Sequence, residues 1–215
     1  MMKKEREMTQ LHDCSNFIEQ ALHCQEEEMP LSLQHIKGLK LEGADLSDLS
    51  FRECLLEGCV FVRCSFQKCD FRSITFRSCD ISGCDFTESY FSGCRLETVK
   101  AVGADFTESL LRDISAVGCS FQYANFFSSR LEKMSCTDTD LSHADFPSCK
   151  LKEFQLNGVR MIETNFFHTP LSGVDLTSCE ISALTLSEEN KELAGAIVDL
   201  YQAAELAKRM GLIIK

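Results

Sequence analysis

The stretch "CDFTESYFSGCRLETVKAVGADFTE" (residues 84–108) places an apolar residue at every fifth position. The same spacing runs from Ile36 to Leu186 without an insertion or a deletion. Of the 31 positions in this series, 27 are Phe, Leu or Ile. A period of five fits neither the 3.6-residue period of a helix nor the two-residue alternation of a strand. The sequence therefore predicts a solenoid, in which short repeats stack on one another.

Two further positions of the five-residue unit are equally regular. Ten of the 13 cysteines lie two residues before the large apolar residue, and nine of the 11 glycines lie two residues after it. Side chains two residues apart in an extended segment share a side, so the large and the small residue should point inward together. Glycine at one fixed phase indicates a bend with positive φ.

This unit resembles the pentapeptide-repeat family, whose pattern is A(D/N)LXX, and the resemblance covers about 151 of the 215 residues. It implies an all-β solenoid, a right-handed quadrilateral β-helix with four units in each coil. Coils would then stack at about 4.8 Å, the spacing of strands in a sheet. The two copies of "DFTES", at residues 85–89 and 105–109, would lie on one face of adjacent coils.

We expect three parts: an N-terminal cap (1–35), the pentapeptide-repeat β-helix (36–187) and a C-terminal helix and strand module (188–215). In the cap, Leu11, Cys14, Ile18 and Leu22 are spaced as on one side of a helix. Such a helix would close the open end of the solenoid, because terminal repeats need capping. A partly disordered tail is the alternative.

The C-terminal module follows a different pattern. An extended segment from Leu193 to Val198 precedes Asp199 and Gln202, which have the spacing of a capping box. Residues 200–210 favour a helix that Gly211 would end, and residues 212–214 suggest a short apolar strand.

The segment "YQAAELAKRMGLII" (201–214) resembles the C-terminal module of Qnr-type quinolone-resistance proteins, a branch of the same family. The resemblance implies a homodimer joined end to end through this module. The residues that we assign to dimerisation are Leu200, Tyr201, Ala204, Ala207, Met210, Leu212, Ile213 and Ile214.

The net charge of −11 argues against direct nucleic-acid binding, which needs clustered Lys and Arg. Under a twenty-residue coil, the excess negative charge falls on one face, formed by residues 44–48 and their equivalents at steps of 20. When Glu188 at its far end is left out, this acidic face has a net charge of −6, while the other three faces together hold 14 acids and 14 bases. Its single base is Lys68. The partner-binding residues that we predict on it are Asp45, Asp48, Asp85, Glu88, Asp105, Glu108 and Asp145.

Two interpretations of the acidic face remain open. It could be a solvated surface that keeps the protein in solution, as runs of like charge usually are. It could also imitate DNA, since a column of carboxylates at coil spacing approaches the ~3.4 Å per phosphate of one DNA strand. The Qnr-type resemblance implies the second: a non-enzymatic DNA mimic that binds DNA gyrase or topoisomerase IV and modulates their activity or quinolone susceptibility. The alternative is a rigid scaffold or adaptor for an unrelated protein partner.

The repeat departs from the Qnr proteins of Gram-negative bacteria in one respect. Those proteins interrupt their repeats with loops that matter for protecting gyrase, whereas this chain has no interruption between residues 36 and 186. Binding and inhibition of a topoisomerase are therefore better supported than protection from quinolones.

The acidic face changes character toward its C-terminal end, where outward positions hold Phe127, Pro147 and Phe167. Apolar residues in line on a surface indicate an interface or a docked segment. We expect the chain after Leu186 to fold over them.

Catalytic and metal-binding patterns are lacking. The cysteines follow C-x4-C spacing rather than C-x2-C, so we predict no metal and no cofactor, and buried thiols acting as small hydrophobes. Cys59 with Cys79, and Cys64 with Cys84, would stack close enough for a disulfide, which we do not expect in a reducing cytosol. No apolar run spans a membrane, and no signal sequence follows the basic opening residues, so we expect a cytoplasmic protein that is not an enzyme.

Overall fold

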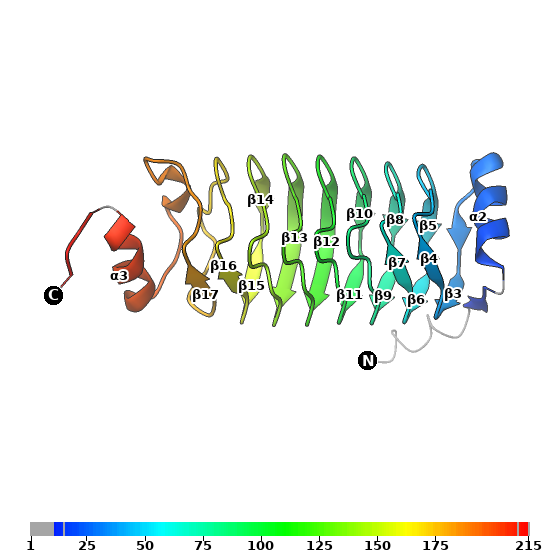
Figure 1. The fold of residues 1–215 in the computed structure, drawn as a ribbon, viewed down its shortest axis with the longest axis horizontal. Coiled ribbons are helices and arrows are strands. Elements are labelled where there is room, and N and C mark those ends of the chain that lie inside the picture. The colour runs from blue at the N-terminus through cyan, green and yellow to red at the C-terminus, as the bar shows by residue number, and fades with distance from the viewer. Residues whose placement is uncertain (1–10, 15, 210, 215) are drawn as a thin grey trace.

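The computed structural model describes residues 11–14, 16–209 and 211–214, and they form one β-solenoid of about eight turns (Figure 1). Helix α2 (Phe17–Glu26) lies at the N-terminal end and helix α3 (Leu200–Arg209) at the C-terminal end. A short 3-10 helix, η2 (Lys191–Leu193), follows the last repeats. Among the described residues, no helix is long and apolar enough to cross a membrane.

The coil has four sides, and we name three of them by their strands. The β5 face contains β2 (Leu31–Ser32), β5 (Ser50–Arg52), β8 (Asp70–Arg72), β10 (Tyr90–Ser92) and β14 (Lys150–Lys152). The β6 face contains β1 (His12–Asp13), β3 (Gln34–Lys37), β6 (Leu55–Glu57), β9 (Thr75–Arg77), β11 (Arg95–Glu97) and β15 (Gln155–Asn157). The β7 face contains β4 (Lys40–Glu42), β7 (Val60–Val62), β16 (Arg160–Ile162) and β17 (Glu180–Ser182). Two longer strands, β12 (Leu110–Val117) and β13 (Arg130–Thr137), cross the corner between the β5 and β6 faces.

Pairing throughout the repeat is parallel, with partners twenty residues apart. Phe51 pairs with Phe71, and Phe76 pairs with Leu96. On the fourth side, the acidic face, single-residue bridges connect the coils, as between Asp85 and Asp105. The predicted register of four five-residue units per coil is therefore confirmed.

Stacked phenylalanine rings fill the centre of the coil. Behind the acidic face, six rings from Phe66 to Phe166 follow one another at centroid separations of 4.5–5.3 Å and interplanar angles of at most 15°. A second stack joins Phe51, Phe71 and Phe91. The separation of stacked rings matches the ~4.8 Å spacing of neighbouring strands, so each ring fills the height of its own coil. The prediction that the large apolar residue of each unit points inward is confirmed at Phe71 and Phe86, each of which is 1% exposed.

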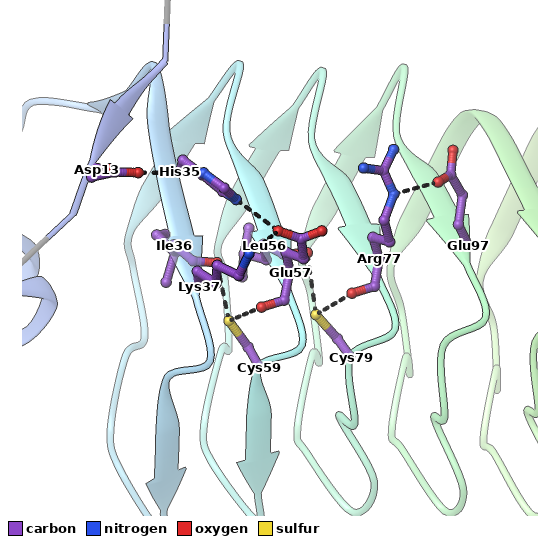
Figure 2. Close-up of polar contacts among 10 residues, drawn as sticks. All are labelled: Asp13, His35, Ile36, Lys37, Leu56, Glu57, Cys59, Arg77, Cys79 and Glu97. Atoms are coloured by element: carbon purple, nitrogen blue, oxygen red, sulfur yellow. Dashed lines mark hydrogen bonds and ion pairs between the residues drawn. The ribbon is translucent and has the colours of Figure 1, made fainter. Parts of the chain in front are cut away.

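The small inward position has a polar function that explains its residue types. In Figure 2, the Cys59 thiol donates to the carbonyl of Ile36 at 3.3 Å, and the Cys79 thiol donates to that of Leu56 at the same distance. Ser109 donates to the carbonyl of Phe86 in the equivalent way, at 2.7 Å. A buried carbonyl needs a partner, and Cys, Ser and Thr can supply one without needing much space.

The thiols serve as these small donors in the reduced state. All 13 cysteines are free, including Cys59 with Cys79 and Cys64 with Cys84. Burial raises the pKa of Cys69 and Cys149 to about 12, which keeps both thiols neutral.

The N-terminal cap differs from the predicted helix in position and in its buried side. Residues His12–Asp13 form β1, which pairs with β3, so Leu11 and Cys14 flank a strand rather than a helical turn. Helix α2 begins at Phe17 and buries Phe17 and Ala21, whereas Ile18 and Leu22 are 39% and 53% exposed. The prediction of a helical stripe through Leu11, Cys14, Ile18 and Leu22 is therefore wrong. The phase of the helix is set instead by Phe17, whose ring extends the second stack at 6.5 Å from Phe51.

The C-terminal module differs from the prediction at two places, its first residues and its last ones. Leu193 ends η2 and residues 194–195 form a turn, so the prediction of an extended segment is wrong for its first residues. Ile197 is extended and bridges to Asp175. The predicted capping box is present, since Gln202 N–H donates to Asp199 at 2.8 Å and Asp199 N–H donates to Gln202 at 3.0 Å. Residues 212–214 form no strand, so that prediction is wrong; a strand needs a neighbouring edge, and no described segment provides one.

Gln202 also closes the last coil. Its side-chain amide donates to the carbonyls of Leu176 and Cys179, both at 2.8 Å. These two carbonyls would otherwise face the open end of the solenoid, so the first turn of α3 caps the stack.

Two adjacent phenylalanines test the inward and outward assignment. Phe126→Ala should lower the free energy of unfolding by about 3–5 kcal/mol, because it removes a fully buried ring from the stack. Phe127→Ala, which truncates a ring that is 43% exposed, should change it by less than about 1 kcal/mol. Denaturant titration of the two variants measures both values, and similar losses would show that the assignment is wrong.

Candidate functional site: the acidic face

Seven acids give this face its charge, and they lie in two columns. The inner column runs through Asp45, Ser65, Asp85, Asp105, Asn125, Asp145 and Asn165, linked by parallel bridges from coil to coil. The outer column follows the bend of each unit and contains Asp48, Lys68, Glu88 and Glu108, all with φ between +56° and +59°. The structure thus places all seven predicted residues on one side of the solenoid.

The inner column has a structural function. Asp85 Oδ1 accepts hydrogen bonds from the Thr87 N–H at 2.9 Å and the Thr87 hydroxyl at 2.6 Å, and Asp105 makes the same pair of bonds with Thr107. Asn125 replaces the carboxylate in the next coil and accepts the N–H of Phe127 at 3.0 Å. These are Asx turns, which need a side-chain oxygen rather than a charge.

The same turn occurs on other sides of the coil, for example at Asp80 and Asp175. An Asp at this position is therefore no evidence of binding by itself. The prediction of Asp85 and Asp105 as binding residues overlooks this turn, although the Asp-x-Thr spacing in "DFTES" is a visible signal of it.

The outer column has no such function. The structure describes no hydrogen bond or ion pair for the carboxylates of Asp48, Glu88 and Glu108, and all three residues are exposed. Removing their charge would cost the turn nothing, because the bend depends on the backbone. Their carboxylates are therefore available to a partner.

Ion pairing separates the acidic face from its neighbours. On the β6 face, Figure 2 shows His35 between Asp13 and Glu57, and Arg77 paired with Glu97 at 2.9 Å. On the β5 face, Arg112 pairs with Glu132 at 2.9 Å. Among the ion pairs within the described part of the chain, none includes any of the seven acids. The face therefore carries uncompensated negative charge.

Hydrogen bonding lowers the pKa of two of the inner carboxylates, Asp45 and Asp85. The side-chain and backbone hydrogen bonds from Ser47 lower the pKa of Asp45. Partial burial raises the pKa of Asp85, but hydrogen bonds from Thr87 and Gln67 outweigh this effect and leave the pKa below its ordinary value. Both groups are charged at neutral pH.

Comparison with known families identifies the repeat. A model described as a pentapeptide repeat region matches residues 35–101, and a model of pentapeptide repeats in eight copies matches residues 119–154. Both matched segments, which make up most of the solenoid, therefore consist of pentapeptide repeats. No curated protein matches the sequence.

Two solved structures share the fold of this pentapeptide-repeat protein. Both are trypsin-treated forms of QnrB1, a plasmid-mediated fluoroquinolone resistance protein. One is 24% identical, with 87% of this chain and all of that chain covered and a TM-score of 0.56. The other is 23% identical, with 85% of this chain and 90% of that chain covered and the same TM-score.

The C-terminal half of the acidic face of the pentapeptide-repeat protein is aromatic. Phe127 and Phe167 point outward and are 43% and 41% exposed. The expectation that the chain after Leu186 covers them is wrong. Glu192, itself buried, holds residues 187–192 beside Phe167 by accepting the His168 N–H at 2.8 Å and the Ser187 hydroxyl at 2.8 Å. The following residues continue around the coil, where Ile197 pairs with Asp175, and so do not fold back.

The predicted dimerisation residues fall into two groups. Leu200, Tyr201 and Ile213 are 82%, 83% and 88% exposed, and Leu212 and Ile214 are at least half exposed. Ala204 and Ala207 are only partly exposed, and Ala207 lines a pocket of about 220 Å³ between α3 and residues 190–198. Met210 lies outside the described residues. Within the part that is described, no group of His, Cys, Asp or Glu is placed to hold a metal ion.

Substitution at Asp85 tests the structural function of the inner column. Asp85→Asn keeps an oxygen acceptor for Thr87, so at pH 7 it should cost little, whereas Asp85→Ala should cost about 1 kcal/mol by removing that acceptor. Thermal denaturation compares the two. Equal stability of both variants would show that the Asx turn contributes nothing.

The pH dependence of Asp85 has a definite sign. Its pKa is lower in the folded chain than the unfolded value near 3.9, so the carboxylate stabilises the fold above that pH, and this contribution is lost as pH falls below about 4. The stability difference between the wild type and Asp85→Asn should therefore shrink between pH 6 and pH 3. A difference that grows over this range would contradict the sign.

Proposed function

We propose that this protein is a non-enzymatic DNA mimic that binds DNA gyrase or topoisomerase IV through its acidic face. Binding would modulate the activity of the enzyme or its response to quinolones. The observation that carries the proposal is the row of exposed carboxylates for which the described residues supply no cationic partner. The other faces hold as many bases as acids and contain ion pairs such as Arg77 with Glu97. QnrB1, a fluoroquinolone resistance protein with the same fold, and the Qnr-like residues 201–214 indicate the class of target.

The spacing of the charges supports mimicry. Asp85 with Glu88, and Asp105 with Glu108, place two carboxylates in each of two adjacent coils, which are about 4.8 Å apart. This density approaches that of duplex DNA, with one charge per ~1.7 Å of axis. A basic DNA-binding surface would meet a comparable field on the protein.

Rigidity supports the proposal as well. The rings of Phe86 and Phe106 stack at 5.0 Å directly behind the two acidic coils, and the Asx turns hold Asp85 and Asp105 in one orientation. A charged surface that is already ordered loses little conformational entropy on binding.

A rigid adaptor for an unrelated protein is the second candidate. The exposed rings of Tyr123, Phe127 and Phe167 favour it, because DNA offers no counterpart to an aromatic surface. The two candidates differ in whether a topoisomerase binds at all.

We also propose a homodimer through the C-terminal module. Leu200, Tyr201 and Ile213 together expose more apolar surface than the repeat region does over similar lengths, and such patches mark interfaces. Residues 212–214, which pair with no described strand, would find a partner in a second copy of the chain.

Neutralisation of four acids on the acidic face tests the main proposal. The variant Asp85→Asn, Glu88→Gln, Asp105→Asn, Glu108→Gln should bind gyrase at least tenfold more weakly, because the interaction is electrostatic. Added salt should weaken the wild type more than the variant. Binding is measured by surface plasmon resonance, with supercoiling as a parallel readout.

The matched control removes four acids from the β5 face: Glu53→Gln, Asp113→Asn, Glu132→Gln and Glu153→Gln. Binding should change by less than threefold (a factor of three is about 0.7 kcal/mol), because the bases of the β5 face outnumber its acids and leave it without a negative field. If both sets of substitutions weaken the affinity for gyrase equally, the effect comes from net charge alone and not from the acidic face. No loss from either set would reject the acidic face as the binding surface.

Two exposed residues test the dimer without disturbing the cap. Leu200→Ser with Tyr201→Ser leaves Gln202 and its bonds to the last coil in place, so the fold should persist. Light scattering should change from twice the chain mass of 24.2 kDa to that mass. A variant that keeps the dimer mass would place the interface elsewhere.

A further inference from the structure

The acidic face has two chemically different halves that share one register. In its N-terminal coils, the outward position after the inward apolar residue holds Ser47, Gln67, Thr87 and Thr107. In the next three coils the same position holds Phe127, Pro147 and Phe167, which we call the aromatic column. The Glu108 N–H donates to the Phe127 carbonyl at 2.8 Å, so the change from charged to apolar occurs within one coil.

We propose that the aromatic column binds an apolar side chain of the same partner segment whose basic residues lie on the carboxylates. The partner is thus a protein segment with Lys and Arg on one side of an apolar residue. This inference rests on the proposed function, since it assigns the part of the partner that reaches beyond the acids.

The fold does not require the aromatic column. Phe126 and Phe166, the inward neighbours, are fully buried, whereas Phe127 and Phe167 remain 43% and 41% exposed. Polar residues at the equivalent position support the same Asx turn, as Thr107 does with Asp105. Two exposed rings in line across three coils therefore form a surface for contact.

A pocket lies at the end of the aromatic column. It has a volume of about 660 Å³, and its lining includes Phe167, His168, Pro170 and Lys191. The His168 ring stacks on Phe167 at 3.9 Å, which holds the phenylalanine at the pocket wall. An aliphatic or aromatic side chain could bury its surface here, as anchor residues do at protein interfaces.

Spacing defines the partner more closely. Phe167 lies three coils from Asp105 and Glu108, a distance of about 14 Å at ~4.8 Å per coil. An extended chain covers this distance in about four residues at ~3.3 Å each. The segment should therefore carry an apolar residue separated by about four residues from a cluster of Lys and Arg.

Charge excludes a nucleic acid from this surface, because the carboxylates would repel its phosphates. A small apolar ligand would use the pocket alone and would be indifferent to the acids. A protein segment of mixed character is the occupant that uses both halves.

Synthetic peptides test the proposal independently of any topoisomerase. The probe peptide has Leu-Phe, a four-residue Gly-Ser spacer and six Lys and Arg residues, made in both orders, and the reference peptide has Ser-Ser in place of Leu-Phe. The wild type should bind one order of the probe at least tenfold more tightly than its reference, measured by fluorescence anisotropy. Equal affinity of the wild type for the probe and the reference overturns the proposal.

Three variants show which residues are responsible for the difference in affinity between the probe and the reference peptide. Phe127→Ser with Phe167→Ser should abolish the discrimination while leaving the melting temperature unchanged. Val117→Ser, which removes a 44% exposed apolar residue from the opposite β6 face, should preserve it. The variant with four neutralised acids should lose affinity for both peptides. A double phenylalanine variant that still discriminates, or an acid variant that binds the probe fully, overturns the two-part surface.

Gyrase binding by the wild type and by the double phenylalanine variant distinguishes a failure of this inference from a failure of the proposed function. If gyrase binds the wild type and binds the double phenylalanine variant at least tenfold more weakly, the inference is supported on the proposed target. If gyrase binds both equally, the aromatic column is not used there and the inference is overturned, while the proposed function stands. If gyrase does not bind the wild type, the proposed function fails, and the peptide discrimination alone supports or overturns the inference.

Discussion

The stacking of inward phenylalanine rings is the interaction on which the rest of the structure depends. Rings from Phe66 to Phe166 repeat at 4.5–5.3 Å, so consecutive coils must stay in register and at strand spacing. A slip by one residue would turn every inward ring toward water. Because the register is held, outward residues twenty positions apart also stack, and a charge placed once in each coil becomes a column.

This constraint explains how the molecule separates folding from recognition. Inward positions carry the rings and the small Cys, Ser and Thr donors that satisfy buried carbonyls, as Cys59 does for Ile36. The inner acidic column stabilises turns, in which Asp85 and Asp105 accept backbone hydrogen bonds. The outer acidic column, which includes Glu88 and Glu108, makes no such structural contacts among the described residues, and its carboxylates find no cationic partner there.

Much of the fold could be predicted from the sequence, because the period of five sets both the inward positions and the bends. The positive φ of Gly58 and Gly83 and the capping box at Asp199 and Gln202 are local properties, which short spacing reveals. The start and phase of α2 depend on Phe17 meeting Phe51, a tertiary contact that helical spacing cannot indicate. The paths of residues 187–198 and 212–214 likewise depend on distant partners.

The site shows the same division. The clustering of the seven acids followed from the register alone. The sequence did not reveal which of these acids stabilise turns, because that depends on the hydrogen bonds of Thr87 and Thr107. It also did not reveal which acids lack partners, because that depends on where the ion pairs form on the other faces.

Competition with duplex DNA tests the mimicry most directly. Gyrase is immobilised, and the affinity of the protein is measured at increasing concentrations of a linear duplex that fills the DNA channel. If the acidic face occupies that channel, the apparent Kd rises in proportion to the DNA concentration until the protein is fully displaced. A stable complex of gyrase, DNA and this protein, with an unchanged Kd, would contradict DNA mimicry.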